Sequence, residues 1–354
     1  MIFKTARGMI NLKKIIGALL CAAVALSVAG CGSASDGAKS ESGEVETQSE
    51  LTKITVADNP FIGAAPLYVA VDKGIFEKYG LDVEIASFDD PSQCLSALIS
   101  GNVDISGSTL DSVVIIADQY RDRYPQVVSI RDDSAGADGI VAKNGIETVA
   151  DLKGKTVGVA INQTTHFLLR QALDQAGVSE DDLNLVDMTS SDAGVSFISG
   201  NLDAAVTWEP YLSNAADSGA GKMIFSSADA PGSIMDVIVV SQSTAEEKPE
   251  WVGDFLKALD EANQFIANDE TRDEAMEITA QHLDISKEEA EAMLPTVKLY
   301  STSEAAEALG DGGLARNTVE KISDFYVEKD VISDTVDAAD ILNTGFLEAD
   351  TSQE

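Results

Sequence analysis

The chain carries one six-residue motif twice, and this internal repeat restricts its fold more than any other feature. Residues 99–104 read ISGNVD, and residues 198–203, ninety-nine positions further on, read ISGNLD. Each copy follows a predicted helix and leads into a short apolar strand. Gly101 and Gly200 are predicted to end these helices in the left-handed conformation, with asparagine in the turn. A motif repeated at this spacing predicts two similar folded units.

The similarity extends upstream of the motif, so that each copy reads strand, helix, strand, helix, strand. The predicted elements are strand 54–57, helix 65–79, strand 81–86 and helix 91–100 in the first copy, and strand 156–160, helix 165–176, strand 183–187 and helix 192–199 in the second. Right-handed crossovers make such strands parallel, which predicts the α/β class with two lobes, each a mostly parallel sheet flanked by helices. One large doubly wound sheet is the alternative, and the complete, separate copies favour two lobes.

The rest of the chain is predicted to return to the first lobe. Residues 234–240 read as a buried strand, and apolar residues recur at helical spacing in 251–268, 270–282, 287–293 and 314–327. The predicted boundaries are lobe 1 at 52–137 and 234–354 and lobe 2 at 138–233. The chain would cross between the lobes near 138–143 and 232–240, which predicts a hinge of two extended segments.

The first thirty residues are typical of a signal peptide. Lys13 and Lys14 precede an apolar run at 15–28, which is too short to span a bilayer. The run ends in small residues before Cys31, a sequence that resembles a bacterial lipoprotein lipobox. The prediction is a signal peptide at 1–30 and a diacylglycerol anchor on Cys31; an ordinary cleaved signal is the alternative.

Residues 31–51 are mostly small, polar or charged, and they predict a disordered tether between the lipid and the folded body. The whole chain has a formal net charge of −36, and removal of 1–30, which contains four basic and no acidic residues, would make it −40. Nucleic acid and anionic lipid surfaces would be repelled by this charge, so we expect neither as a partner.

Cysteine and histidine are too few for a disulfide framework or a Cys/His metal centre. Cys21 would leave with the signal peptide and Cys31 would be lipidated, so Cys94 would remain alone. His166 and His282 are the two histidines. The sequence therefore predicts no disulfide, no metal and no cofactor.

Several segments resemble one known family. They are PLYVA at 66–70, GIF at 74–76, YGLDVE at 79–84, DLKGKTVGV at 151–159 and DAAVTWEPY at 203–211. Together they are similar to nitrate/sulfonate/taurine-type solute-binding proteins of ABC importers, with thiamine-precursor-binding proteins as relatives. The resemblance covers about 52–348 and implies the type II periplasmic-binding fold, an ABC permease and ATPase as partners, and lobe closure without chemistry. We also expect a monomer, anchored by its lipid at the extracytoplasmic face of the cell membrane.

The candidate ligand-binding residues follow the predicted strands, because ligands of open α/β sheets bind beyond the carboxyl ends of the strands. Phe61 lies in a loop that lines the site in the family. Helix starts can hold an anion through free backbone N–H groups. The candidates at the helix starts are Ser108 and Thr109 in the first lobe and Asn162, Thr164, Thr165 and His166 in the second. Helix capping for these residues, and packing for Phe61, are the alternatives.

Two further candidates follow the strand of the second repeat. Trp208 offers a flat apolar wall or a cation-π surface, and core packing is its alternative role. Glu209 would suit an ammonium group or a ring amine and would oppose a bare anion.

Asp138 and Asp236 lie on the predicted hinge crossings, where they would bind the same amine or accept hinge N–H groups. Arg131 and Arg170 are the nearby basic candidates, and a solvated or packing role is expected for Arg170.

The predicted function is capture of a small sulfonate or zwitterion, with taurine-like molecules fitting best. A pyrimidine or thiamine-precursor heterocycle between Phe61 and Trp208 is the second possibility, and nitrate is the third because acidic groups disfavour it. An enzyme of the same fold is the rival class. That chemistry would need a reactive lysine, clustered histidines or cysteines, and a cytosolic address. The sequence shows no such cluster and no such address, so we predict that the chain is not an enzyme.

Overall fold

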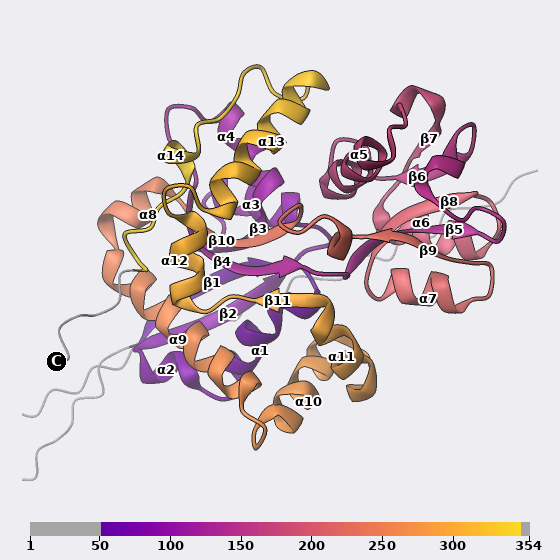
Figure 1. Cartoon of the computed structure of the whole chain (residues 1–354). Coiled ribbons are helices and arrows are strands. Elements are labelled where there is room, and N and C mark those ends of the chain that lie inside the picture. Colours follow the sequence, from indigo (N-terminus) through magenta and orange to yellow (C-terminus); the bar gives the residue numbers. More distant parts are fainter. Residues whose placement is uncertain (1–50, 348–354) are drawn as a thin grey trace, which may run out of the picture. The chain divides into compact units, whose positions relative to one another are not determined.

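The computed structural model describes residues 51–347, which form two β-sheets with flanking helices (Figure 1). The strand order is β11-β4-β10-β3-β1-β2 in the six-stranded sheet and β7-β6-β8-β5-β9 in the five-stranded sheet. The predicted signal peptide, the lipid anchor on Cys31 and the tether as far as Glu50 lie outside the described residues, as do 348–354. Within 51–347, no helix combines the length and apolar character needed to cross a membrane.

The six-stranded sheet has a parallel half and an antiparallel half. Its strands are β1 (Thr52–Asp58), β2 (Leu81–Ser87), β3 (Ile105–Thr109), β4 (Gln126–Ser134), β10 (Met235–Val240) and β11 (Val297–Leu299). The predicted strands β2, β1 and β3 run parallel, whereas β10 pairs antiparallel with both β3 and β4, and β11 pairs antiparallel with β4. This sheet therefore takes up strands from three distant parts of the chain.

Helices cover both faces of this sheet. They are α1 (Ala65–Asp72), α2 (Ile75–Lys78), α3 (Pro91–Ile99), α4 (Leu110–Gln119), α8 (Gln242–Glu247), α9 (Pro249–Ala267), α10 (Arg272–Leu283), α11 (Lys287–Met293), α12 (Thr302–Leu309), α13 (Leu314–Glu328) and α14 (Ala338–Ile341). In Figure 1, α1, α9 and α10 lie below the sheet and α3, α4 and α13 above it. One hydrophobic core includes residues from Ile54 to Leu347. The C-terminal helices thus pack on the first sheet, as predicted.

The prediction of one helix over 65–79 is wrong. Helix α1 ends at Asp72, and α2 begins only at Ile75. Gly74 between them has a φ angle of 62°, in the left-handed region that breaks a right-handed helix. The apolar periodicity of the segment therefore did not reveal the break between the two helices.

The five-stranded sheet separates two hydrophobic cores. Its elements are β5 (Asp138–Lys143), β6 (Thr156–Val159), α5 (Thr164–Ala176), β7 (Asn184–Asp187), α6 (Ser190–Ile198), β8 (Ala204–Trp208), α7 (Tyr211–Asp217) and β9 (Gly221–Ser226). Side chains alternate along a strand, so Ile140 faces the core beneath α5 while Val141 faces the core beneath α6 and α7. Strands β7, β6 and β8 are parallel, and β5 is antiparallel to β8 and β9.

Both copies of the repeated motif end their helix in the same way. The Asn102 N–H donates to the Ala97 carbonyl at 3.0 Å, and the Asn201 N–H donates to the Ser196 carbonyl at 3.1 Å. Each bond spans a glycine of positive φ, 73° in the first copy and 83° in the second. These are the bonds of a Schellman motif, and they confirm the predicted helix ends.

The aspartate that closes each motif ties two parallel strands together. Asp104 Oδ2 accepts from the Thr55 N–H at 2.9 Å, and Asp203 Oδ2 accepts from the Thr156 N–H at 3.0 Å. In return, each aspartate N–H donates to the carbonyl of the same threonine. The repeat therefore fixes β3 beside β1 and β8 beside β6.

Two short segments, 135–137 and 227–234, connect the sheets. The predicted crossings near 138–143 and 232–240 are wrong in position, because these residues are mostly β5 and β10, inside the sheets. The connections contact each other: the Ser134 N–H donates to the Ile234 carbonyl at 2.9 Å, and the Gly136 N–H donates to Ser227 Oγ at 2.8 Å. Paired connections are thus present, and the exact lobe boundaries stay a prediction.

Candidate ligand-binding site

A cavity that is partly open to solvent lies where residues from the two sheets meet. Its lining residues are Asn59, Phe61, Pro91, Thr109, Asp138, Thr164, Trp208, Ile234 and Asp236. Six of the eleven predicted site residues are among them. Larger hollows beside α9 and α8 contain none of the predicted residues. The cavity at the strand ends is therefore the candidate site.

Two aromatic side chains form apolar parts of the wall. Phe61 follows β1 at the start of a short 3-10 turn and is 8% exposed. Trp208 is the last residue of β8 and pairs in register with Asp138 of β5. Strand β8 is the second copy of the strand that ends at Thr109, so the repeat brings both strand ends to one cavity.

Two carboxyl groups also line the cavity. Asp138 begins β5 and accepts a hydrogen bond from Ser134 Oγ at 2.6 Å. Burial raises the pKa of Asp138 to about 7, although the bond from Ser134 lowers it. Asp236 lies in β10, and burial raises its pKa above the usual range against the opposing effect of Arg131. Both groups offer oxygen acceptors to a guest.

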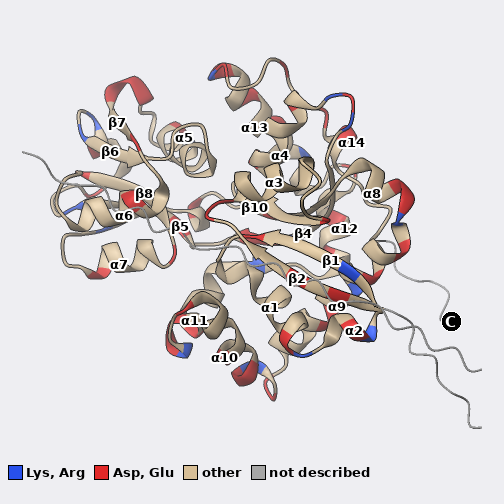
Figure 2. Ribbon diagram, turned by 180° about the vertical axis from the view of Figure 1, so that it is seen from behind, with Lys and Arg blue, Asp and Glu red and all other residues tan. Residues whose placement is uncertain are grey.

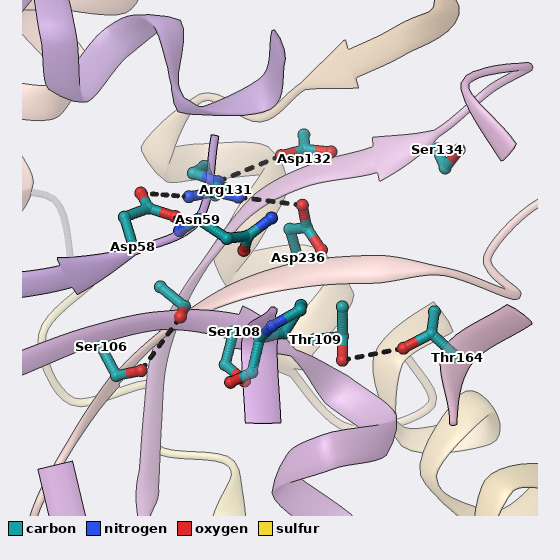
Figure 3. A network of polar contacts seen from close by, with 12 residues as sticks. Asp58, Asn59, Ser106, Ser108, Thr109, Arg131, Asp132, Ser134, Thr164 and Asp236 are labelled. Atoms are coloured by element: carbon teal, nitrogen blue, oxygen red, sulfur yellow. Dashed lines mark hydrogen bonds and ion pairs between the residues drawn. The ribbon is translucent and has the colours of Figure 1, made fainter. Parts of the chain in front are cut away.

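Arg131 bonds three carboxylates and is not among the residues that line the cavity (Figure 3). Its guanidinium lies 2.6 Å from Asp58 Oδ2, 3.2 Å from Asp132 Oδ2 and 2.9 Å from Asp236 Oδ2. All four side chains are buried. Burial, reinforced by Asp236, raises the pKa of Asp132 well above its usual range. The arginine thus offsets internal negative charge and holds Asp236 in place.

A chain of hydroxyl groups joins the two helix starts at the cavity. Thr109 Oγ1 lies 3.2 Å from Thr164 Oγ1, as Figure 3 shows. Thr164 Oγ1 in turn donates to Asp111, at 3.0 Å from Oδ1 and 3.1 Å from Oδ2. The Tyr326 hydroxyl of α13 donates to the same carboxylate at 2.9 Å. The first turns of α4 and α5 are therefore linked through Asp111.

Two predicted hydroxyl residues bond within the protein, away from the cavity wall. Ser108 is 1% exposed, and its hydroxyl donates to the Pro91 carbonyl at 3.0 Å. Thr165 is equally buried, and its hydroxyl lies 3.2 Å from Ser190 Oγ at the start of α6. Neither one is a lining residue.

His166 and Asn162 form an internal contact at the start of α5. His166 Nδ1 accepts from the Asn162 N–H at 3.0 Å. His166 Nε2 lies 3.2 Å from Glu180 Oε2, within ion-pair distance but outside hydrogen-bond geometry. The contact with His166, together with Lys329, lowers the pKa of Glu180 to about 2. The imidazole thus orders the loop before α5, and it does not line the cavity.

Glu209 caps the helix that follows it. Its carboxylate accepts from the Ser213 N–H at 3.1 Å and from Ser213 Oγ at 2.6 Å. The peptide bond before Pro210 is cis, and the Glu209 side chain lies over the first turn of α7. The structure therefore places Glu209 outside the lining residues, whereas Asp138 and Asp236, the other two predicted partners of an amine, line the cavity.

Arg170 has the packing role expected for it. Its guanidinium bonds Asp174 on the same helix and forms two bonds to Glu328 on α13, at 2.6 and 3.0 Å. This pair joins a helix of the second sheet to a helix of the first.

Several residues at the site were not predicted as candidates. Asn59, Pro91 and Ile234 line the cavity, and Asp111 and Tyr326 lie behind it. Asp111 had one sequence signal, a lone carboxylate near the start of the apolar run 110–117. Tyr326 comes from the far end of the chain and had no local signal.

The surroundings of the cavity are acidic. Figure 2 shows Asp and Glu in red along the chain where β4, β5 and β10 approach one another. Asp132, Asp133, Asp138 and Asp236 lie there with Arg131 as their buried cation. Among the described residues, no group of three or more His, Cys, Asp or Glu could hold a metal ion. The site chemistry favours a guest that brings positive charge or N–H donors.

Two α/β sheets with a cavity at their strand ends define the periplasmic-binding protein fold, and solved structures agree. The periplasmic aliphatic sulphonate-binding protein of Escherichia coli matches with a TM-score of 0.68 and 21% identity, over 81% of this chain and 96% of that chain. The alkanesulfonate-binding protein of Xanthomonas axonopodis matches with a TM-score of 0.67 and 18% identity, over 84% of this chain and 100% of that chain.

Sequence comparison identifies the family. Residues 62–272, more than half of the chain, match the NMT1/THI5-like family. The chain is also 30% identical to the taurine-binding periplasmic protein of Escherichia coli over 229 residues, which are 62% of this chain and 69% of that protein. The chain belongs to the NMT1/THI5-like family.

Proposed function

We propose that the chain is the extracytoplasmic solute-binding component of an ABC importer and that it captures a small sulfonate or zwitterion of the taurine type. The observation that carries the proposal is a cavity between two sheets with two carboxylates and two aromatic side chains in its wall. Its family and its relatives, a taurine-binding and two sulfonate-binding proteins, support the same function.

The two ends of a taurine-like guest find complementary groups in the cavity. The ammonium group bonds Asp138 and Asp236. Asp138 forms no ion pair within residues 51–347, and Asp236 shares Arg131 with Asp58 and Asp132. The sulfonate bonds the remaining side-chain donors of the wall, the Asn59 amide and the Trp208 indole N–H. The carbon atoms lie against the Phe61 and Trp208 rings.

The proposed role is binding without chemical conversion. Among the lining residues there is no Lys, His or Cys to act as a nucleophile. Asp138, whose pKa is raised to about 7, is assigned to the ammonium group of the guest. Arg131 and Asp111, the charged groups next to the wall, bond protein partners. The proposal includes a permease and an ATPase as partners, a lipid on Cys31 that holds a monomer at the membrane, and no nucleic acid.

An aminopyrimidine of the thiamine-precursor type is the second candidate ligand. Its flat ring suits the Phe61 and Trp208 surfaces, and its amino group suits Asp138. Nitrate is disfavoured because it would lie beside two carboxylates without a free basic side chain in the wall.

Isothermal calorimetry with taurine, ethanesulfonate, nitrate and hydroxymethylpyrimidine tests the proposal. Taurine is expected to bind most tightly, and Asp138→Asn is expected to weaken taurine binding at least about tenfold through loss of a charged hydrogen bond. Glu209→Gln makes the same change of charge at a carboxylate bonded to Ser213 and is expected to have a much smaller effect.

Equal losses in the two variants would contradict the assigned amine position. Tightest binding of nitrate would contradict the proposed ligand class.

A further inference from the structure

Asp111 is a buried carboxylate whose partners are hydroxyl groups. It lies in the first turn of α4, is 3% exposed and forms no ion pair within residues 51–347. It contacts Thr164 of α5 and Tyr326 of α13, so three helices meet at one carboxylate. The groups that it orders belong to the cavity wall, because Thr109 and Thr164 are both lining residues.

The carboxylate decides where the hydroxyl protons point. An ionised carboxylate only accepts, so Thr164 and Tyr326 must donate to Asp111. A hydroxyl has a single proton, which leaves Thr164 Oγ1 able only to accept from its other neighbours. Thr109 Oγ1 lies 2.9 Å from Ser112 Oγ and 3.2 Å from Thr164 Oγ1, so its single proton has two acceptors within the protein. With their protons donated within the protein, both threonine oxygens can accept from a guest.

Acceptors consequently outnumber donors on the cavity wall. Asp138 and Asp236 accept as carboxylates, and Thr164 accepts because it donates its only proton to Asp111. Thr109 accepts when it donates its own proton to Thr164 or to Ser112. Only Asn59 and Trp208 among the lining side chains have N–H groups to donate. A guest without N–H donors would leave buried acceptors unpaired, and sites of that kind reject such guests strongly.

We propose that Asp111 is a positioning residue for specificity: it fixes Thr164 as an acceptor, which leaves Thr109 next to an oxygen that can only accept. In this way it restricts the cavity to guests with several N–H donors, that is, amines and aminated heterocycles. This inference rests on the proposed function and narrows its ligand class. An alkanesulfonate without an amino group is then a poor guest, although related proteins are named for sulfonates.

An isosteric substitution tests the inference. In Asp111→Asn the new amide can accept from Tyr326 and donate to Thr164, which turns the Thr164 proton toward the cavity. The probes are two matched pairs, and the members of each pair differ in one amino group. The first pair is taurine and ethanesulfonate, and the second is 4-aminopyrimidine and pyrimidine. The ratio of dissociation constants within a pair is insensitive to loss of folded protein, and calorimetry measures it. The expected result is that Asp111→Asn reduces the preference for the aminated partner about tenfold.

Tyr326→Phe provides the matched control. It removes a donor to Asp111 and is expected to lower the melting temperature, but Thr164 still donates to the carboxylate, so the preference within each pair is expected to stay as in the wild type. Burial raises the pKa of Asp111, whereas bonds from Thr109, Tyr326 and Thr164 lower it, so the titrations are run at pH 8 to favour the carboxylate.

The outcomes separate the two proposals. In one outcome, the wild-type protein binds the aminated probes and Asp111→Asn has the same ratio of dissociation constants as the wild type. This result would overturn the role of Asp111 alone. Wild-type protein that binds ethanesulfonate as tightly as taurine would overturn the inference and leave solute binding intact. Wild-type protein that binds none of the four probes would overturn the proposed ligand class, and the inference with it.

Discussion

Asp138 is expected to lower the stability of the fold at neutral pH, because its proposed role in ligand binding requires a buried carboxylate. Burial raises its pKa to about 7, and the hydroxyl of Ser134 offsets only part of this effect. In the unfolded chain the same carboxyl group would titrate near about 3.9. The folded state therefore binds the proton more tightly than the unfolded state. This contribution to stability is largest below about pH 4 and is lost as the pH rises through about 7.

Asp138→Asn is expected to gain stability relative to the wild type as the pH rises. Between pH 5 and pH 8 the difference in unfolding free energy should move in favour of the variant by on the order of 2 kcal/mol, because asparagine carries no charge that burial can penalise. Guanidinium unfolding of the ligand-free proteins at both pH values measures this. A difference that does not change with pH would contradict the raised pKa. The same variant is expected to bind taurine less well. Asp138 would therefore lower the stability of the wild-type protein and increase its affinity for taurine.

At the scale of residues, the sequence predicted positions better than it predicted side-chain directions. Thr109 and Trp208 line the cavity because the rule on strand ends needs only the position of a strand. Glu209 and Thr165 are one residue away from lining residues, and their side chains point to other partners. Asp111 was missed because its role depends on Tyr326, 215 positions later in the chain.

At the scale of elements, helix α5 of the second sheet packs on helix α13. The Phe325 ring is 5% exposed and lies 5.3 Å from the His166 ring and 5.4 Å from the Phe167 ring. Around it, Arg170 bonds Glu328, and Lys329 lies 2.8 Å from Glu180. The Arg170 and Glu328 side chains are 24% and 55% exposed, so solvent screens their attraction. The buried aromatic contact is expected to dominate.

Two substitutions on α13 separate these contributions. Phe325→Ala is expected to cost about 3 kcal/mol of unfolding free energy, because it leaves a cavity between α13 and α5. Glu328→Gln is expected to cost less than about 1 kcal/mol. Chemical denaturation at moderate salt compares them. If Glu328→Gln were the more damaging change, the ion pairs and not the ring would hold the two helices together.

Elements with local signals were predicted, and elements without them were not. The helix ends at Gly101 and Gly200 were predicted because each depends on residues within about two turns of the helix end. Strand β11 has three residues and exists through its pairing with β4, about 160 positions earlier in the chain. A pattern within so short a segment cannot distinguish a strand from a loop.

At the scale of the whole molecule, the repeat predicted two sheets, and the connections between them were predicted less well. Strands 138–143 and 235–240 are apolar and extended, so they looked like crossings, but each of them pairs inside a sheet. The true connections, 135–137 and 227–234, are short and consist mostly of small residues, and Ser134, Gly136 and Ser227 make the contact between them. Hydrogen bonds between two loops leave no periodic signal in a sequence.

These two connections allow a ligand-dependent change that scattering can measure. The cavity is lined by Thr109 and Asp236 of the first sheet and by Asp138 and Trp208 of the second. A bound guest therefore contacts both sheets at once. A guest that bonds both sheets favours the arrangement in which they are close, by its difference in affinity for the two arrangements. We therefore expect saturating taurine to reduce the radius of gyration of the described body in small-angle X-ray scattering. Asp138→Asn at the same taurine concentration should show a smaller reduction. An unchanged radius with taurine bound, as verified by calorimetry, would mean that capture needs no closure, because the two sheets already hold the binding arrangement without a guest.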